Sequence, residues 1–296
     1  MVGSTPRRRR NLAPRHGLVS GHEANDPKID VFFIGVGKCG TSWIYKHLSR
    51  RGDIGVPKIK EPYILNHPRH EQASQIEALY DEQRPRCDFS NVYYWDTSIP
   101  EKIAEHNPEA KIVLTVRKPS KRVQSHFAFL QRNGEFVDRG LVDYLNSGDS
   151  EQLVERSDYQ RVLDRFGDAL ADDQLLVLPL ELLAANTEQY AHTLAEFLGV
   201  PKLALSEEDT QTVLGRSSAR SPFLSRAAKR LAGQLRDRGY LVALARLKEL
   251  SIIQRMLFSQ SSPANAEIDV NELPKRLKDL DAAYPNFLRR YGVHLN

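Results

Sequence analysis

Residues 29–43 constrain the fold of this chain more than any other segment. Apart from one aspartate, residues 29–34 are β-branched or aromatic, which is typical of a short buried strand. Three glycines follow between positions 35 and 40, and residues 41–51 then show the apolar spacing of a helix. A glycine turn between a strand and a helix directs backbone N–H groups and a helix N-terminus at one point, where they bind phosphate. The segment therefore predicts an α/β protein with an anion site.

The rest of the chain repeats the alternation of strands and helices. Further strands are expected at residues 54–57, 111–116 and 174–179, and further helices from Pro119 onward and over residues 159–166, 190–198 and 273–291. Strands that alternate with helices imply a mostly parallel sheet with helices on both of its faces. We therefore expect a P-loop-like three-layer α/β fold.

The N-terminal segment differs in composition from everything that follows it. Residues 1–27 hold five arginines, two acidic residues and no apolar period, so we expect a basic disordered arm. This arm contributes +3 of the net charge of +4, which leaves +1 for residues 28–296. A nearly neutral globular part argues against nucleic acid as a partner. We expect residues 28–296 to form a single domain whose C-terminal part, from about residue 223, is helical.

Two cysteines, Cys39 and Cys87, are too few for a disulfide framework. No apolar run approaches the ~18 residues of a membrane span, and the first 27 residues lack the apolar core of a secretory signal. We therefore expect a cytoplasmic protein with reduced thiols and no stable membrane insertion. A homo-oligomer is compatible with the sequence.

The glycine turn admits three interpretations, two of which meet obstacles. A dinucleotide site needs an acidic residue at the end of the second strand, whereas Asp53 precedes residues 54–57. A P-loop NTPase needs its lysine after the last glycine, whereas Lys38 precedes Gly40. It also needs an acidic Mg²⁺ ligand at the end of a later strand, where this chain has Arg117. A cation at that position favours an anion site that uses no metal.

The third interpretation follows from that cation. Lys38, Thr41 and Ser42 are suited to a 5′-phosphate group, and Arg117 with Ser125 offers a second anion site. A nucleotide that carries phosphates at both its 5′ and 3′ positions requires two such sites. The nucleotide of this kind that we expect is 3′-phosphoadenosine 5′-phosphosulfate (PAPS).

Three motifs resemble those of the PAPS-dependent sulfotransferase superfamily. Residues 37–43 (GKCGTSW) are similar to the 5′-phosphosulfate loop, and residues 116–127 are similar to the 3′-phosphate motif, with Arg117 and Ser125 at the family's spacing of eight. Lys60-Glu61-Pro62 resembles the K-E-P element of the carbohydrate sulfotransferases. The resemblance covers about residues 29–225.

This resemblance implies PAPS as the co-substrate and adenosine 3′,5′-bisphosphate as the product. It implies that Trp43 stacks on adenine and that residues 215–221 form a second 3′-phosphate loop. The expected cofactor-binding residues are Gly37, Lys38, Cys39, Gly40, Thr41, Ser42, Trp43, Arg117, Ser125, Arg216 and Arg220.

The expected catalytic residues are Lys38, Glu61 and Lys60. Lys38 stabilises charge on the sulfuryl group, as the resemblance implies. Glu61 follows residues 54–57 on the carboxyl side of the sheet and is our first choice of general base. Lys60 would lower the pKa of Glu61 or contact the sulfate, and His126 is the alternative base. No metal ligand is expected.

The acceptor is expected to be a small molecule or a carbohydrate, with a sugar, phenol, lipid or secondary-metabolite hydroxyl all compatible with the sequence. Its pocket has six aromatic candidates, which are Tyr63, Phe89, Tyr93, Tyr94, Trp95 and Tyr159. Two other functions stay open at this point. One is a P-loop small-molecule kinase, and the other is a catalytically silent nucleotide-binding protein of the same fold.

Overall fold

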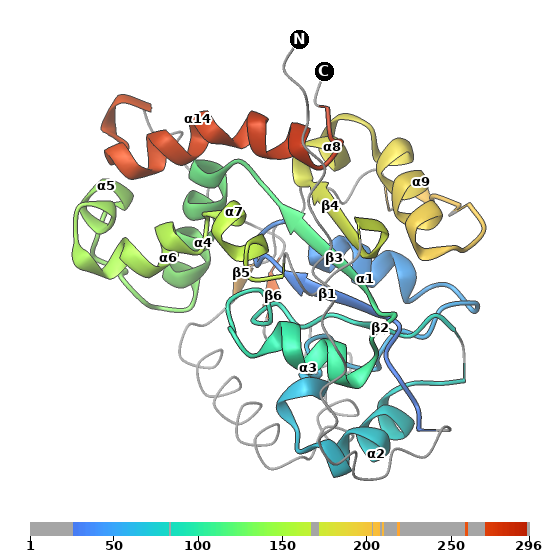
Figure 1. Ribbon diagram of the computed structural model, residues 1–296. Coiled ribbons are helices and arrows are strands. Elements are labelled where there is room, and N and C mark those ends of the chain that lie inside the picture. The colour runs from blue at the N-terminus through green and yellow to red at the C-terminus, as the bar shows by residue number, and fades with distance from the viewer. Residues whose placement is uncertain are drawn as a thin grey trace, which may run out of the picture.

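Four parallel strands form the centre of the molecule (Figure 1). The computed structural model describes residues 26–82, 84–166, 172–202, 204–207, 209, 218–219, 258–259 and 270–294. The strands lie in the order β2 (Cys87–Asp88), β1 (Val31–Gly35), β3 (Lys111–Val116) and β4 (Leu175–Pro179). The N-terminal arm up to residue 25, the helical stretch expected from residue 223, and both Arg216 and Arg220 lie outside the described residues.

The second strand is not where the sequence places it. The prediction of a strand at residues 54–57 is wrong, because that segment makes only one isolated parallel bridge, from Gly55 to Arg86. Pro57 has no N–H group for a ladder, and the glycine offers no side chain to pack. The sheet is instead extended by the buried pair Cys87–Asp88, which lies in register with Val31 and Phe32.

Helices cover both faces of the sheet, as expected. They are α1 (Thr41–Leu48), α2 (Arg69–Leu79), α3 (Ile99–His106), α4 (Pro119–Arg132), α5 (Leu141–Leu145), α6 (Glu151–Glu155), α7 (Tyr159–Leu163), α8 (Leu180–Ala185), α9 (Thr187–Leu198) and α14 (Lys275–Arg290). Short 3₁₀ turns occur at Ile64–Asn66, Gly148–Ser150, Asp172–Gln174 and Val270–Glu272, and β5 (Ser218–Ala219) pairs antiparallel with β6 (Phe258–Ser259). The predicted central α/β architecture is confirmed.

Alternate residues of β1 face the two helical layers. Val31 and Phe33 pack with residues of α1, α8 and α9, whereas Phe32 and Ile34 pack with residues of α2, α3 and α7. All four side chains are buried. A strand that is apolar on both sides is the pattern expected of a parallel sheet with both faces covered.

The loops that follow β1 and β3 leave the same edge of the sheet. Thr115 joins them, because its Oγ1 donates to the carbonyl of Gly35 at 2.9 Å and its own carbonyl accepts the N–H of Val36 at 2.8 Å. The chain goes on from β1 to β2 on one side, while β3 pairs with β1 on the other. Ligands of open α/β sheets bind at such a switch point.

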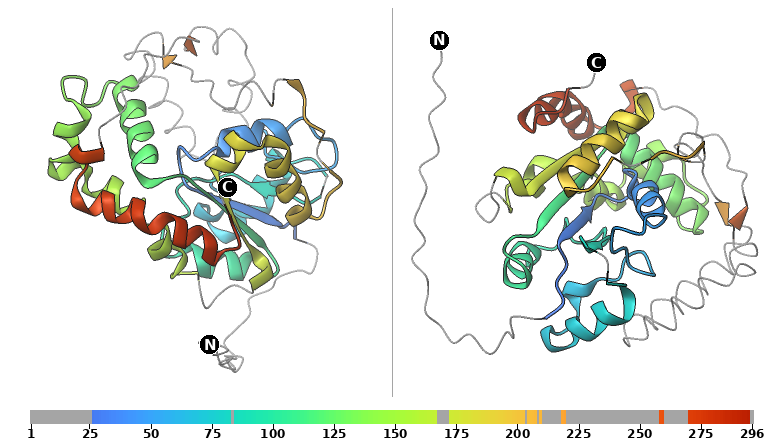
Figure 2. Two further views of the ribbon diagram at one scale, coloured as in Figure 1. Left: turned by 90° about the horizontal axis from the view of Figure 1, so that it is seen from above. Right: turned by 90° about the vertical axis from the view of Figure 1, so that its right-hand side faces the viewer.

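A third apolar cluster joins α4, α5 and α6 to the first part of α14. Figure 2 shows α14 alongside α4. Asp281 of α14 accepts the backbone N–H of Ser120 at 2.9 Å, so it satisfies one of the free N–H groups in the first turn of α4. These helices therefore fix the position of the segment that begins at Arg117.

Candidate active site

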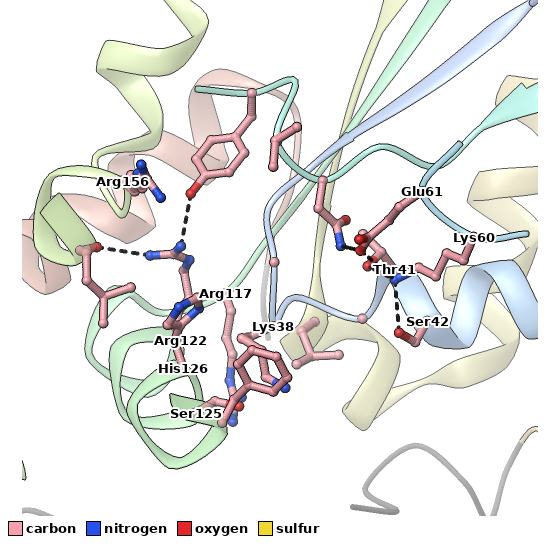
Figure 3. A pocket seen from close by; sticks show the side chains of 18 of the residues that line it. Lys38, Thr41, Ser42, Lys60, Glu61, Arg117, Arg122, Ser125, His126 and Arg156 are labelled. Atoms are coloured by element: carbon pink, nitrogen blue, oxygen red, sulfur yellow. Dashed lines mark hydrogen bonds and ion pairs between the residues drawn. The ribbon is translucent and has the colours of Figure 1, made fainter. Parts of the chain in front are cut away.

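A cavity of about 780 Å³ opens between the loops that follow β1 and β3. Lys38 and Glu61 line it, and so do Arg117 and Ser125. Figure 3 shows Arg117 and Ser125 on the α4 side of this cavity and Glu61 on the α1 side. The two anion sites inferred from the sequence therefore share one cavity at the carboxyl edge of the sheet.

The glycine loop needs two of its three glycines. Gly35 has φ +128°, and a Cβ there would lie 2.8 Å from the carbonyl oxygen of Asn91. Gly40, the residue before α1, has φ +96°. Between them, Lys38 adopts φ 75°, a conformation that is costly for a side chain and is common at functional sites. Its ammonium lies 4.8 Å from the centre of the Phe129 ring.

The Lys60 ammonium lies against the hydroxyl groups at the start of α1. It donates to Thr41 Oγ1 at 3.2 Å and to Ser42 Oγ at 3.1 Å (Figure 3). The first turn of α1 contains no acidic residue. A carboxylate there would repel a bound anion. A cation, two hydroxyls and a helix N-terminus thus converge on one point, which suits a phosphate oxygen.

Glu61 is held by two neutral donors. Asn91 Nδ2 donates to its Oε1 at 2.6 Å, and the Tyr63 hydroxyl donates to its Oε2 at 2.8 Å. Lys60 Nζ lies 3.8 Å from Oε1. Glu61 itself has φ 64°, so two of the three expected catalytic residues adopt left-handed backbone conformations. Each carboxylate oxygen keeps a lone pair for a further hydrogen bond.

The turn after β3 is anchored on both sides. The Tyr159 hydroxyl donates to the carbonyl of Arg117 at 2.6 Å, and Glu181 accepts the N–H of Lys118 at 2.8 Å. Pro119 then occupies the first turn of α4, as the sequence predicts. Arg117 and Ser125 line the cavity from the start and the second turn of this segment.

Trp43 lines the cavity and is held by its neighbours. Its ring stacks on His47 with centroids 5.0 Å apart, and its Nε1 donates to the carbonyl of Asp209 at 3.0 Å. The Asp209 carboxylate pairs with His47 at 3.2 Å and with Arg50. These contacts fix the plane of the Trp43 indole ring.

The thiol of Cys39 does not face the cavity. Its side chain is fully buried in the core, and burial raises the pKa of the thiol to about 12. A thiol with that pKa stays protonated and unreactive at neutral pH. Any contact that Cys39 makes with a nucleotide is thus restricted to its backbone.

His126, the alternative base, also lines the cavity. Burial lowers its pKa to about 4, helped by the positive charges of Arg122, Lys38 and Arg156. The imidazole is therefore neutral at pH 7. It remains an alternative base, although protonation would place a positive charge beside those of Arg122, Lys38 and Arg156.

Sequence reasoning missed three residues that build the site. Asn91 follows the unpredicted strand β2, and nothing in the local pattern indicates its bond to Glu61. Arg122 is 1% exposed, and Arg156 is half-buried beside it on the cavity wall. The only signal for Arg122 is its place between Arg117 and Ser125 within the second motif.

The aromatic candidates divide into two groups. Tyr63 and Tyr94 line the cavity, so they remain candidates for the acceptor pocket. Phe89, Tyr93 and Tyr159 are core residues instead: Phe89 stacks on Phe33 with centroids 4.3 Å apart. Trp95 packs against the core between two arginines.

Among the residues that the structure describes, no three His, Cys, Asp or Glu side chains gather as metal ligands would. Within the same residues, no helix combines the length and apolar character needed to cross a bilayer.

Comparison with known proteins identifies the family. The model of the sulfotransferase domain family matches residues 28–222, which is well over half of the chain. The chain belongs to this family. It is an enzyme that transfers a sulfuryl group, with PAPS as the donor and a small-molecule acceptor. No curated protein sequence matches the chain significantly.

Solved sulfotransferase structures are similar to this chain at low sequence identity. A sulfotransferase from Alicyclobacillus acidocaldarius is 20% identical, with a TM-score of 0.51, over 63% of this chain and 90% of that one. The sulfotransferase domain of the Synechococcus PCC 7002 olefin synthase is 15% identical, with a TM-score of 0.46, over 94% of this chain and 100% of that one. The first of these similarities supports the P-loop-like α/β fold.

Proposed function

We propose that the enzyme transfers the sulfuryl group of PAPS to a hydroxyl of its acceptor by in-line displacement, with Glu61 as general base. The observation that carries this proposal is the shared cavity of Lys38, Glu61, Arg117 and Ser125. In this proposal, Lys38 serves the 5′-phosphosulfate, Arg117 and Ser125 serve the 3′-phosphate, and the Glu61 carboxylate serves the acceptor hydroxyl.

The residues divide the chemistry between them. Glu61 takes the proton of the acceptor hydroxyl as that oxygen forms its bond to sulfur. The bond between sulfur and the 5′-phosphate oxygen breaks, and its electron pair stays on that oxygen. Lys38 and Lys60 stabilise the negative charge on the sulfuryl and leaving oxygens, and each such preorganised donor is worth ~10²–10³ in rate.

The same proposal assigns the binding roles. Thr41, Ser42 and the N–H groups of the loop that includes Gly37, Cys39 and Gly40 hold the 5′-phosphate. Arg117 and Ser125 hold the 3′-phosphate, and Trp43 stacks on adenine. Arg216 and Arg220 lie outside the described residues and are proposed as further 3′-phosphate ligands from the family resemblance alone.

Calorimetry with adenosine 3′,5′-bisphosphate and with ATP, each with and without Mg²⁺, tests the proposal against a kinase of similar fold. Tight binding of the bisphosphate with the same affinity in the presence and absence of Mg²⁺ supports the proposed function. Binding of ATP that requires Mg²⁺ contradicts it. Transfer of ³⁵S from labelled PAPS to an acceptor then distinguishes the enzyme from a silent nucleotide-binding protein, for which the label stays on PAPS.

We further propose a cytoplasmic location, since both cysteines are free and buried, and one domain over residues 28–296. The K-E-P element supports a carbohydrate among the acceptors to be tested. A homo-oligomer remains a proposal that the sedimentation of the full chain would test.

A further inference from the structure

The cavity wall opposite Glu61 carries positive charge that the proposed cofactor roles do not use. Figure 3 shows Arg122 and Arg156 on this wall, across the cavity from Lys60 and Glu61. Both line the cavity. The proposed 5′ and 3′ sites already have their own donors in Lys38, Lys60 and Arg117, so this second pair of cations requires a separate explanation.

Arg156 has no carboxylate partner among the described residues. Its Nε is buried and has no hydrogen-bond partner there, and its guanidinium stacks over the Trp95 ring at 5.2 Å. Three acids close to it in the sequence are engaged elsewhere: Glu155 pairs with Arg161 at 2.9 Å, Asp158 accepts the N–H of Arg161 at 3.2 Å, and Asp149 pairs with Arg139 at 2.5 Å. Stacking on an indole holds the guanidinium flat and leaves its edge available for hydrogen bonds.

Arg122 adds a second buried cation to this wall. The side chain is 1% exposed, and among the described residues it donates only to neutral oxygens: the Leu153 carbonyl, the Ser157 hydroxyl and the Tyr94 hydroxyl. Its Nε has no partner within the described part of the chain. A buried cation without a counterion is unfavourable, so an anion that enters this end of the cavity gains from both arginines.

Asp149 and His126 also line the cavity, and neither of them cancels the charge of the two arginines. Asp149 lines the cavity, but its carboxylate is paired with Arg139. His126 is neutral at pH 7, because burial lowers its pKa to about 4. Tyr63, Tyr94 and Phe129 also line the cavity and contribute aromatic surface to it.

We propose that Arg156, supported by Arg122, binds an oxyanion on the acceptor. The acceptor is then a hydroxyl compound that also carries a carboxylate or a sulfate on a ring-sized framework. This inference rests on the proposed function, since it assumes that Glu61 faces the hydroxyl while Arg156 holds the other end of the molecule.

The test begins with calorimetry of adenosine 3′,5′-bisphosphate, because a failure at this step overturns the proposed function and not the acceptor assignment alone. Three probes are then titrated into the bisphosphate-saturated full chain: 4-hydroxybenzoate, its neutral methyl ester, and 4-hydroxyphenyl sulfate. The chain has two tryptophans, so the indole N–H signal of Trp95 reports on binding beside Arg156 in an NMR spectrum.

We expect the carboxylate, the sulfate or both to bind at least about tenfold more tightly than the ester, as a charge-assisted hydrogen bond provides. Which of the two anions binds more tightly identifies the oxyanion. Arg156→Gln should abolish the preference and leave the bisphosphate Kd unchanged, and Arg156→Lys should retain part of it. Labelled PAPS should show the same preference in kcat/KM.

Arg165→Gln is the matched control. Arg165 stacks on the same Trp95 ring at 5.0 Å and donates to the Trp95 carbonyl at 3.0 Å, but it does not line the cavity. This variant should shift the Trp95 signal and keep the preference for the anion. The acceptor assignment would be overturned if neither anion binds more tightly than the ester, if no probe binds, or if the preference survives Arg156→Gln.

Discussion

Asn91 donates its side-chain amide to Glu61 Oε1 across 2.6 Å, although the two residues lie 30 positions apart. The bond joins the loop after β2 to the loop that precedes Ile64–Asn66. It holds the carboxylate toward the cavity while the backbone of Glu61 stays at φ 64°. Asn91 is a neutral donor, so it orients the carboxylate without adding a second positive charge to that of Lys60, whose Nζ lies 3.8 Å from Oε1.

Glu61→Gln tests the base. The amide keeps the size of the side chain but cannot accept a proton, so kcat should fall by about 10²-fold or more. The Kd of adenosine 3′,5′-bisphosphate, measured by calorimetry, should stay the same. Glu71→Gln is the control, because the Glu71 side chain is 45% exposed and lies outside the cavity. Unchanged turnover in Glu61→Gln would transfer the role to His126.

Lys38→Ala removes the cation at the centre of the site. The loss of one preorganised donor should lower kcat by at least about 10²-fold. Lys58→Ala is matched in charge and side-chain size but lies outside the cavity, where Lys58 pairs with Asp81 at 3.5 Å. The two variants are compared by transfer of ³⁵S from PAPS at saturating donor. Near-normal turnover in Lys38→Ala would remove this lysine from the mechanism.

Arg117→Ala and Ser125→Ala test the 3′-phosphate site by comparing two ligands. Arg117→Ala removes a charge-assisted hydrogen bond and should raise the Kd of adenosine 3′,5′-bisphosphate by about 10–100-fold. Ser125→Ala removes a hydroxyl and should raise this Kd by about 2–10-fold. Adenosine 5′-monophosphate lacks the 3′-phosphate, so its Kd should change little in either variant. A parallel loss for both ligands would show that these residues act on the rest of the nucleotide.

The parts of the site that the sequence predicted share one property. Each of them lies in or next to a strand or helix that the pattern of apolar residues predicts. They are the glycine loop, Thr41, Ser42 and Arg117. Their place at one edge of the sheet then follows from the parallel topology. Glu61 was predicted on a wrong premise, since residues 54–57 form only a single bridge. It faces the cavity because Asn91 and Tyr63 hold it there.

The missed parts depend on contacts that no local pattern encodes. A two-residue strand such as Cys87–Asp88 has no period, so the loop that carries Asn91 could not be placed. Arginines usually lie at the surface, and the burial of Arg122 depends on oxygens from Leu153 and Ser157, more than 30 residues away. Such positions are fixed by tertiary packing.

Gly35→Ala should destabilise the chain, whereas Gly37→Ala should not. A Cβ at Gly35 would meet the Asn91 carbonyl and the Tyr94 ring, both at 2.8 Å, and φ there is +128°. We expect a loss of at least about 2 kcal/mol in the free energy of unfolding. A Cβ at Gly37 has nothing within 4 Å, so Gly37→Ala should change the free energy of unfolding by less than about 1 kcal/mol. Urea unfolding measures both, and equal losses would contradict the close approach of these loops.

Asp88 should make the stability depend on pH. Burial raises its pKa to about 7, although Ser90 donates to it, and its Oδ2 has no partner among the described residues. Between the unfolded pKa of about 3.9 and the folded value, the native state binds a proton that the unfolded chain has released. The free energy of unfolding therefore falls as pH rises through this range and levels off above it.

Asp88→Asn stays neutral at every pH and should lose this dependence. From pH 5 to pH 8, the free energy of unfolding of the unmodified chain should fall by on the order of 2–3 kcal/mol more than that of the variant. Urea unfolding at the two pH values measures the difference. Asp81→Asn changes a carboxylate that is 71% exposed and should keep the original dependence. If Asp88→Asn and the unmodified chain lose the same stability over this range, Asp88 is ionised in the folded protein and another group titrates.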